Sequence, residues 1–141
     1  MITMTPYLLM AGGAVFLLLG VLHAVYTLTD ISKPRRIVPT DPALISYMRE
    51  STVRLSRGGS TMWDAWVGFN LSHSLGAILF ALGCIATGHF LVQLALPKAA
   101  LLIPVAIGML YLAMSIRYWF RVPTTGISIA TALLLAGWVL Y

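Results

Sequence analysis

Long, uninterrupted runs of apolar residues dominate the chain. Four runs have the length of about 20 residues that an α-helix needs to cross the hydrocarbon core of a bilayer. They are residues 7–28, 62–86, 99–120 and 123–141. Apolar residues follow one another in these runs without alternating with polar ones, which favours helices over membrane-barrel strands. The pattern predicts an all-α fold, an integral membrane bundle of four transmembrane helices, as a single membrane domain over residues 1–141.

A polar segment, residues 29–61, separates the first two runs. Thr40-Asp41-Pro42 is typical of a helix start, because the aspartate can cap the first turn and proline is tolerated there. The sequence therefore predicts a short amphipathic helix over residues 42–57, ended by Gly58-Gly59. Two interpretations stay open. The helix lies in the membrane interface with its apolar face among the head groups, or it forms a lid over a pocket open to the cytoplasm.

Composition supports a membrane protein. Hydrophobic residues make up 60% of the 141 residues and charged residues only 9%, and the mean hydropathy is +0.92. Soluble domains carry roughly 25% charged residues, so an ordinary water-soluble domain and a disordered chain are excluded. The single cysteine, Cys84, excludes an internal disulfide framework.

The basic residues are distributed unequally between the two sides of the predicted bundle. Eight of the nine lie in the 29–61 segment or at the turn around Arg117 and Arg121, and Lys98 is the ninth. The positive-inside rule places those eight in the cytoplasm and both chain ends on the outer side. The net charge of +5 thus indicates orientation, with some attraction to anionic membrane lipids, and no nucleic-acid partner is expected.

Polar side chains are concentrated in the inner halves of the spans. The set comprises His23 in the first run, Trp63, Trp66, Asn70 and His73 in the second, and Tyr111 and Ser115 in the third. The four in the second run share one face of a helix. Polar groups in a spanning helix are costly and often functional. If the residues of the three runs face one another, they form a cytoplasm-facing polar pocket for a hydrophobic or amphiphilic ligand.

The residue types allow two readings of this set. In the first, His73 or His23 transfers a proton, Asn70 orients the substrate, and Trp63, Trp66, Tyr111 and Ser115 line the ligand site. In the second, the set is a packed, fully hydrogen-bonded cluster that links membrane helices. With the polar faces turned inward, Asn70 is expected to bridge His23 at matching depth in either case, and the ligand site predicts in addition an open cavity beside Asn70 and His73. Whether the protein is an enzyme stays open at this point.

Two histidines on neighbouring helices also raise the question of haem b bridging His23 and His73. Axial ligands must lie at nearly equal depth. His23 lies about five residues from the inner end of its run and His73 about ten from Trp63, which is a mismatch of roughly 7 Å at 1.5 Å per residue. The mismatch disfavours haem. No further strong ligand is expected nearby, so no metal site is predicted.

Two sequence motifs carry a resemblance. Gly20-x-x-His23, together with Arg57-Gly58 and Gly68-Phe69-Asn70-x-Ser72-His73-x-x-Gly76, resembles a family of small uncharacterised bacterial four-helix integral membrane proteins. The resemblance covers most of the chain. It implies a multi-pass protein of the bacterial inner (plasma) membrane and assigns no chemistry.

The layout is more loosely similar to the MAPEG membrane glutathione transferases, trimers that bind glutathione near the cytoplasmic face. Arg117-Tyr118 at the end of the third run contributes to that similarity. The Glu-Arg-x-x-Arg-x-His-x-Asn motif of that family is absent, which removes the residues that would bind glutathione. The alternatives to a ligand-binding bundle are therefore a MAPEG-like enzyme, a transporter, or an accessory subunit of a larger membrane complex. Membrane lipids, a partner subunit or further copies of the chain are the expected partners.

Overall fold

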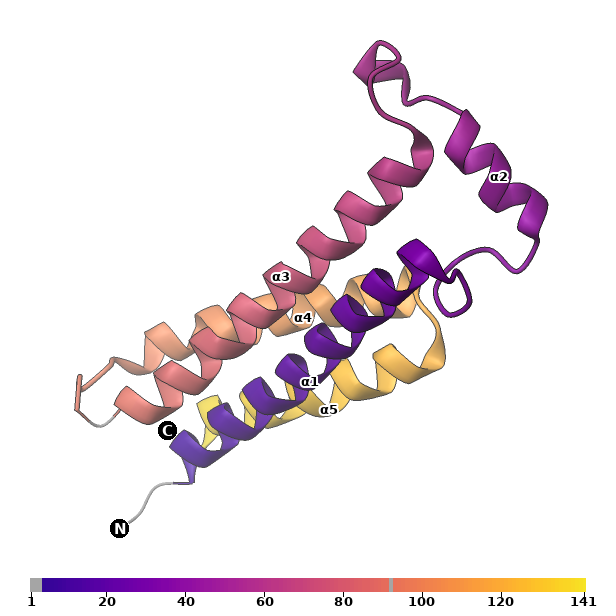
Figure 1. Ribbon diagram of the computed structural model, residues 1–141. Helices are drawn as coiled ribbons and strands as arrows, with labels where there is room; N and C mark the ends of the chain where they lie inside the picture. Colours follow the sequence, from indigo (N-terminus) through magenta and orange to yellow (C-terminus); the bar gives the residue numbers. More distant parts are fainter. Residues whose placement is uncertain (1–3, 92) are drawn as a thin grey trace. The chain divides into compact units, whose positions relative to one another are not determined.

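The computed structural model describes residues 4–91 and 93–141. The described residues are helical throughout their regular elements, and an isolated bridge pairs Thr52 with Thr61. Four helices are long and apolar enough to cross a membrane, which confirms the expected number of candidate spans. In chain order the elements are α1 (Thr5–Ser32), α2 (Pro42–Glu50), η1 (Arg54–Ser56), α3 (Met62–Phe90), η2 (Lys98–Leu101), α4 (Leu102–Tyr118) and α5 (Arg121–Val139) (Figure 1).

The ends of the helices differ from the ends of the apolar runs. α1 continues to Ser32 and α3 to Phe90, four residues beyond each predicted end. Hydropathy reports where apolar residues stop, whereas a helix continues as long as its backbone hydrogen bonds can form, including outside the hydrocarbon core. The third span begins as a 3₁₀ turn, and extended backbone at Trp119 and Phe120 separates α4 from α5.

The chain divides into two compact units. The first unit combines the chain up to Leu19 with Ala77–Tyr141, so it holds the beginning of α1, the end of α3, and all of α4 and α5. The second unit is Gly20–Gly76, with the rest of α1 and α3 and the segment between them. Each unit is described by itself below.

The first unit has an apolar core to which all four helices contribute. Phe16 of α1 packs edge-on against Phe80 of α3 and Tyr111 of α4, with ring centroids 4.9 and 5.5 Å apart. The sole cysteine, Cys84, is also buried in this core. Thr131 of α5 donates a hydrogen bond of 3.1 Å to the carbonyl of Gly108 on α4. Close packing of these side chains stabilises the core through many small dispersion contacts.

Glycines allow the helices of the first unit to come very close. A Cβ atom on Gly88 of α3 would lie 2.6 Å from the carbonyl oxygen of Pro6 on α1, so only glycine fits there. On α5, a Cβ on Gly137 would lie 3.4 Å from Cβ of Leu8. The end of α5 therefore packs beside the start of α1, at the same end of this unit (Figure 1).

In the second unit, α2 begins where the sequence predicted and ends earlier. The carboxylate of Asp41 accepts a hydrogen bond of 2.9 Å from the N–H of Ala43, and Pro42 opens the first turn. The helix stops at Glu50, so the prediction of one helix over residues 42–57 was wrong. The β-branched pair Thr52-Val53 follows at once, and such residues favour extended backbone.

Residues 51–61 form a short hairpin in place of the expected helical turns. The N–H of Val53 donates to the carbonyl of Ser60 at 2.9 Å, and the N–H of Met62 donates to the carbonyl of Ser51 at 2.8 Å. The hairpin reverses through η1 and a left-handed backbone, with φ of 51° at Arg57 and 89° at Gly58. It delivers the chain directly into the first turn of α3.

Candidate functional site

His23 and Asn70 join α1 to α3 inside the second unit. The Nε2 atom of His23 lies 2.8 Å from Oδ1 of Asn70, which confirms the expected bridge. The Nδ2 group of Asn70 donates to the carbonyl oxygen of Trp66 at 2.7 Å. A carbonyl only accepts hydrogen bonds, so this contact fixes the orientation of the amide and turns Oδ1 toward His23. The bridge therefore requires a proton on Nε2 of His23.

His73 completes a cluster with these two residues. Its ring packs edge-on against the ring of His23, with centroids 5.3 Å apart and an interplanar angle of 73°. Both histidines are half-buried. α1 ends nine positions after His23, and α3 begins eleven positions before His73. The depth mismatch is thus roughly 3 Å at 1.5 Å per residue, and the value of roughly 7 Å inferred from the apolar runs was wrong because it used the wrong end of α1.

The cluster has the geometry of packed side chains and does not fit a bridging haem. Iron would have to lie between two histidine rings that here contact each other, and Nε2 of His23 faces Asn70. Within residues 4–91 and 93–141, no group of three or more His, Cys, Asp or Glu could hold a metal ion. What the arrangement offers chemically is a hydrogen-bonded link between two helices.

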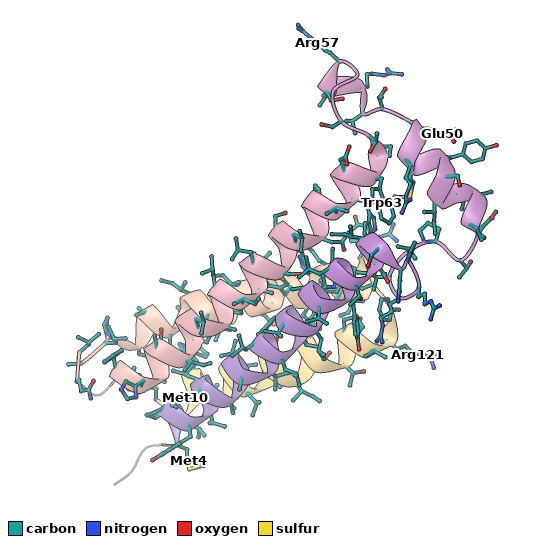
Figure 2. The ribbon with its side chains drawn as sticks, in the orientation of Figure 1. Met4, Met10, Glu50, Arg57, Trp63 and Arg121 are labelled. Carbon is teal, nitrogen blue, oxygen red and sulfur yellow. The ribbon has the colours of Figure 1, made fainter. Side chains whose placement is uncertain are left out.

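Trp63 and Trp66 form a stack at the start of α3. Their rings lie 5.0 Å apart with an interplanar angle of 19°, and the guanidinium carbon of Arg49 on α2 lies 4.8 Å from the centroid of the Trp63 ring. Trp63 is buried and lies where α3 begins (Figure 2). A cation over an indole ring is an attractive contact, so the stack fixes α2 against the first turns of α3.

Tyr111 and Ser115 lie in the first unit. The ring of Tyr111 stacks on Phe80 at 6.0 Å in the apolar core. Ser115 is fully buried, and its hydroxyl donates to the carbonyl of Leu112 in its own helix at 2.9 Å. Both side chains thus have partners inside the first unit, and their role in a ligand site stays a prediction.

Asp30 is a buried acidic residue of the second unit that the sequence analysis did not single out. It lies near the end of α1 with 1% of its surface exposed. Its carboxylate accepts backbone hydrogen bonds of 2.9 to 3.2 Å from Arg35, Arg36 and Ile37. These bonds turn the chain back immediately after α1. An aspartate at a helix C-terminus opposes the helix dipole, and this unfavourable position was the available signal for a compensating loop contact.

The segment after α1 also places an arginine side chain over a tyrosine of α1. The guanidinium of Arg36 lies over the ring of Tyr26, 4.5 Å from its centroid. At the start of α3, Thr61 and Asp64 cap the helix reciprocally: the Thr61 hydroxyl donates to the carboxylate at 2.7 Å, and the N–H of Asp64 donates to the Thr61 oxygen at 3.1 Å. Both contacts place charged groups in structural roles.

Two open hollows lie in the second unit. The first has a volume of about 290 Å³ beside α2, and its lining, mostly apolar, is made by Pro39, Leu44, Tyr47, Met48, Ser51 and Met62. The second has a volume of about 410 Å³ beside the hairpin and is lined by Val53, Leu55, Ser56, Ser60, Asp64 and Ala65. Neither hollow is lined by Asn70 or His73. Residues 39–65 line them instead.

The second unit exposes more basic than acidic side chains. Its six basic residues, all exposed, are Lys33, Arg35, Arg36, Arg49, Arg54 and Arg57. Among the acidic residues, Asp30 is held by backbone amides, Asp64 by Thr61, and Asp41 caps α2. The surface therefore favours anionic groups over cationic ones.

Comparisons with known proteins give no match: no family model, no curated protein and no solved structure is similar to this chain. The geometry of the second unit therefore carries the functional conclusion.

Proposed function

We propose that the protein is a small multi-pass membrane protein that binds a hydrophobic or amphiphilic molecule at its cytoplasmic side. The hollow beside α2 is the binding site. The observation that carries this proposal is its mostly apolar lining from Leu44, Met48 and Met62, located in the unit that also holds the basic segment. An apolar hollow with a few flanking polar groups is the usual form of a small-molecule site. In this proposal, α2 is a wall of the site and lies in the membrane interface.

The histidine cluster supports the site and does not carry out chemistry in this proposal. Asn70 uses its carbonyl oxygen for His23 and its amide nitrogen for Trp66. Each of these atoms makes one hydrogen bond to the chain, and these bonds hold the amide in the link between α1 and α3. This structural use of Asn70 is the reason that the proposal places ligand binding at the hollow and not at the histidine cluster.

The binding proposal predicts a clear effect of one substitution on α2. Leu44→Asn places a polar group in the hollow at a half-exposed position, and it is expected to weaken binding of lysophosphatidylcholine by about tenfold through lost apolar contact. Ser46→Asn, exposed on the same helix and outside the lining, is the matched control. Titration in phosphatidylcholine nanodiscs, read by native mass spectrometry, measures both. Equal affinities for wild type and Leu44→Asn would contradict the proposed site.

Orientation in the membrane follows from the charge distribution. We expect residues 29–61 to face the cytoplasm and both chain ends to face outward in a bacterial inner membrane, because the basic side chains of this segment resist translocation. Alkaline phosphatase fused after Tyr141 should therefore be active, whereas the same enzyme inserted after Gly58 should be inactive. The reversed pattern of activity would invert the topology.

An accessory subunit of a membrane complex is the second candidate. A Cβ atom on Gly68 or on Gly83 of α3 would meet nothing within 4 Å. Glycine in a helix interior is less favourable than alanine by about 1 kcal/mol, so open glycines favour a face that another spanning helix approaches closely. The native mass spectra distinguish the two candidates, because a partner subunit or a second copy adds a protein mass and a bound amphiphile adds a small one.

A further inference from the structure

We propose that the molecule bound beside α2 carries an anionic head group, with phosphate as the favoured chemistry, and that Arg49 binds this head group. The inference rests on the proposed function, because it names the chemical class of the ligand for the same hollow. Three features of the second unit support it: the position of Arg49, the way its guanidinium is held, and the balance of charge around it.

Arg49 is next in the chain to a residue of the hollow, although it is not itself among the lining residues. It follows Met48 of the lining on α2, and its guanidinium lies over Trp63, the residue after Met62 of the lining. Met48 and Met62, the chain neighbours of Arg49 and Trp63, therefore both line the hollow. A ligand whose apolar part contacts Met48 and Met62 brings its polar end within reach of the arginine.

The stack on Trp63 holds the guanidinium in position for binding. Trp63 is itself buried and stacked on Trp66 at 5.0 Å, so it is a rigid support. An arginine that stacks on an aromatic ring keeps N–H donors at its edge for a phosphate or carboxylate, and less side-chain entropy is lost on binding. Arg49 is exposed, so those donors are accessible to a ligand.

The exposed charge of the second unit favours an anion over a cation. Three of the acidic residues in the second unit are already engaged, Asp30 and Asp64 with the chain around them and Asp41 at the cap of α2. Glu50, beside Arg49 in the chain, is exposed and is the competing carboxylate. Against it stand six exposed basic residues. The occupant that fits is an amphiphile with one apolar chain and a phosphate-bearing head group of net negative charge.

The test compares three probes in phosphatidylcholine nanodiscs: lysophosphatidylglycerol, lysophosphatidylcholine of the same chain length, and inorganic phosphate. The wild type should bind the anionic lysolipid about tenfold or more tightly than the zwitterionic one, as a charge-assisted hydrogen bond predicts. Inorganic phosphate should not compete, since it lacks the apolar part. Competition by inorganic phosphate at equal concentration would assign the site to free phosphate and overturn the amphiphile.

Variants of Arg49 separate head-group binding from a structural role. Arg49→Gln should remove the preference for the anionic lysolipid and leave the affinity for the zwitterionic one, while Arg49→Lys should keep most of the preference. Arg57→Gln is the control, because this exposed arginine lies at the turn of the hairpin and points away from α3 (Figure 2). It should keep the full preference.

Three other results would contradict the inference. If Arg49→Gln weakens both lysolipids equally, Arg49 only docks α2 and the inference is overturned. If the wild type binds both lysolipids equally and Leu44→Asn weakens both, the inference fails while the proposed function stands. If neither lysolipid binds the wild type, the proposed function fails together with the inference.

Discussion

Asp30→Asn should lower the free energy of unfolding by about 2–4 kcal/mol. Hydrogen bonds to a buried charged acceptor are strong, and the substitution takes the carboxylate away from the backbone N–H groups that donate to it. The carboxylate accepts from three consecutive backbone amides, those of Arg35, Arg36 and Ile37. An asparagine keeps the shape and one acceptor oxygen, but it turns an NH₂ group toward N–H donors. The segment after α1 should therefore open in the variant.

Two measurements check this expectation. Unfolding in mixed micelles with increasing dodecyl sulfate reports the loss of stability, and trypsin should cleave after Arg35 or Arg36 faster than in the wild type. Asp41→Asn is the matched control, because asparagine caps a helix about as well as aspartate and the expected change there is small. Equal stability of the two variants would mean that the Asp30 carboxylate does not hold the loop.

Gly88→Ala and Gly83→Ala should have opposite effects although both lie on α3. At Gly88 the new methyl group would lie 2.6 Å from the carbonyl oxygen of Pro6 and 2.7 Å from Met10, so α1 and α3 must separate. Overpacking of this kind costs about 1–3 kcal/mol, and a backbone atom as the obstacle places the effect at the upper end. At Gly83 nothing lies within 4 Å, and alanine should stabilise the helix by up to about 1 kcal/mol.

The same unfolding assay measures this pair directly. A loss of stability at position 88 and none at position 83 supports the close packing of α1 on α3. If Gly83→Ala is the damaging substitution in native membranes, then another helix occupies that face and the accessory-subunit candidate gains support. If neither substitution changes stability, the close approach at Gly88 is contradicted.

The four candidate spans were predictable because their signal is a simple quantity, the length of an apolar run. The start of α2 was predictable for a different reason: Asp41 and Pro42 act on the backbone within three residues of themselves. The end of α2 could not be predicted in this way. Whether residues 51–57 continue a helix depends on hydrogen bonds from Val53 to Ser60 and from Met62 to Ser51, and such pairings between distant positions leave no periodic pattern.

The candidate site was predictable in part. The bridge from His23 to Asn70 follows from depth, since both polar groups need partners at a similar level within their helices. Contact between His23 and His73 was missed because the inner end of α1 lies four residues beyond its apolar run. Asp30 was missed because its partners are backbone amides, which every residue carries, so the identities of residues 35–37 give no sign of the contact.

The bridge between His23 and Asn70 has a consequence for synthesis of the protein. The two residues are 47 positions apart, and a ribosome adding about 5–20 residues per second needs roughly 2–9 s to make the chain between them. During that interval His23 has no amide to bind. In the proposed orientation, His23 lies in the inner part of α1, where its ring is within reach of interfacial water while α3 is being made. The free-energy cost of inserting α1 before α3 is thus expected to be lowest when His23 lies near the membrane surface.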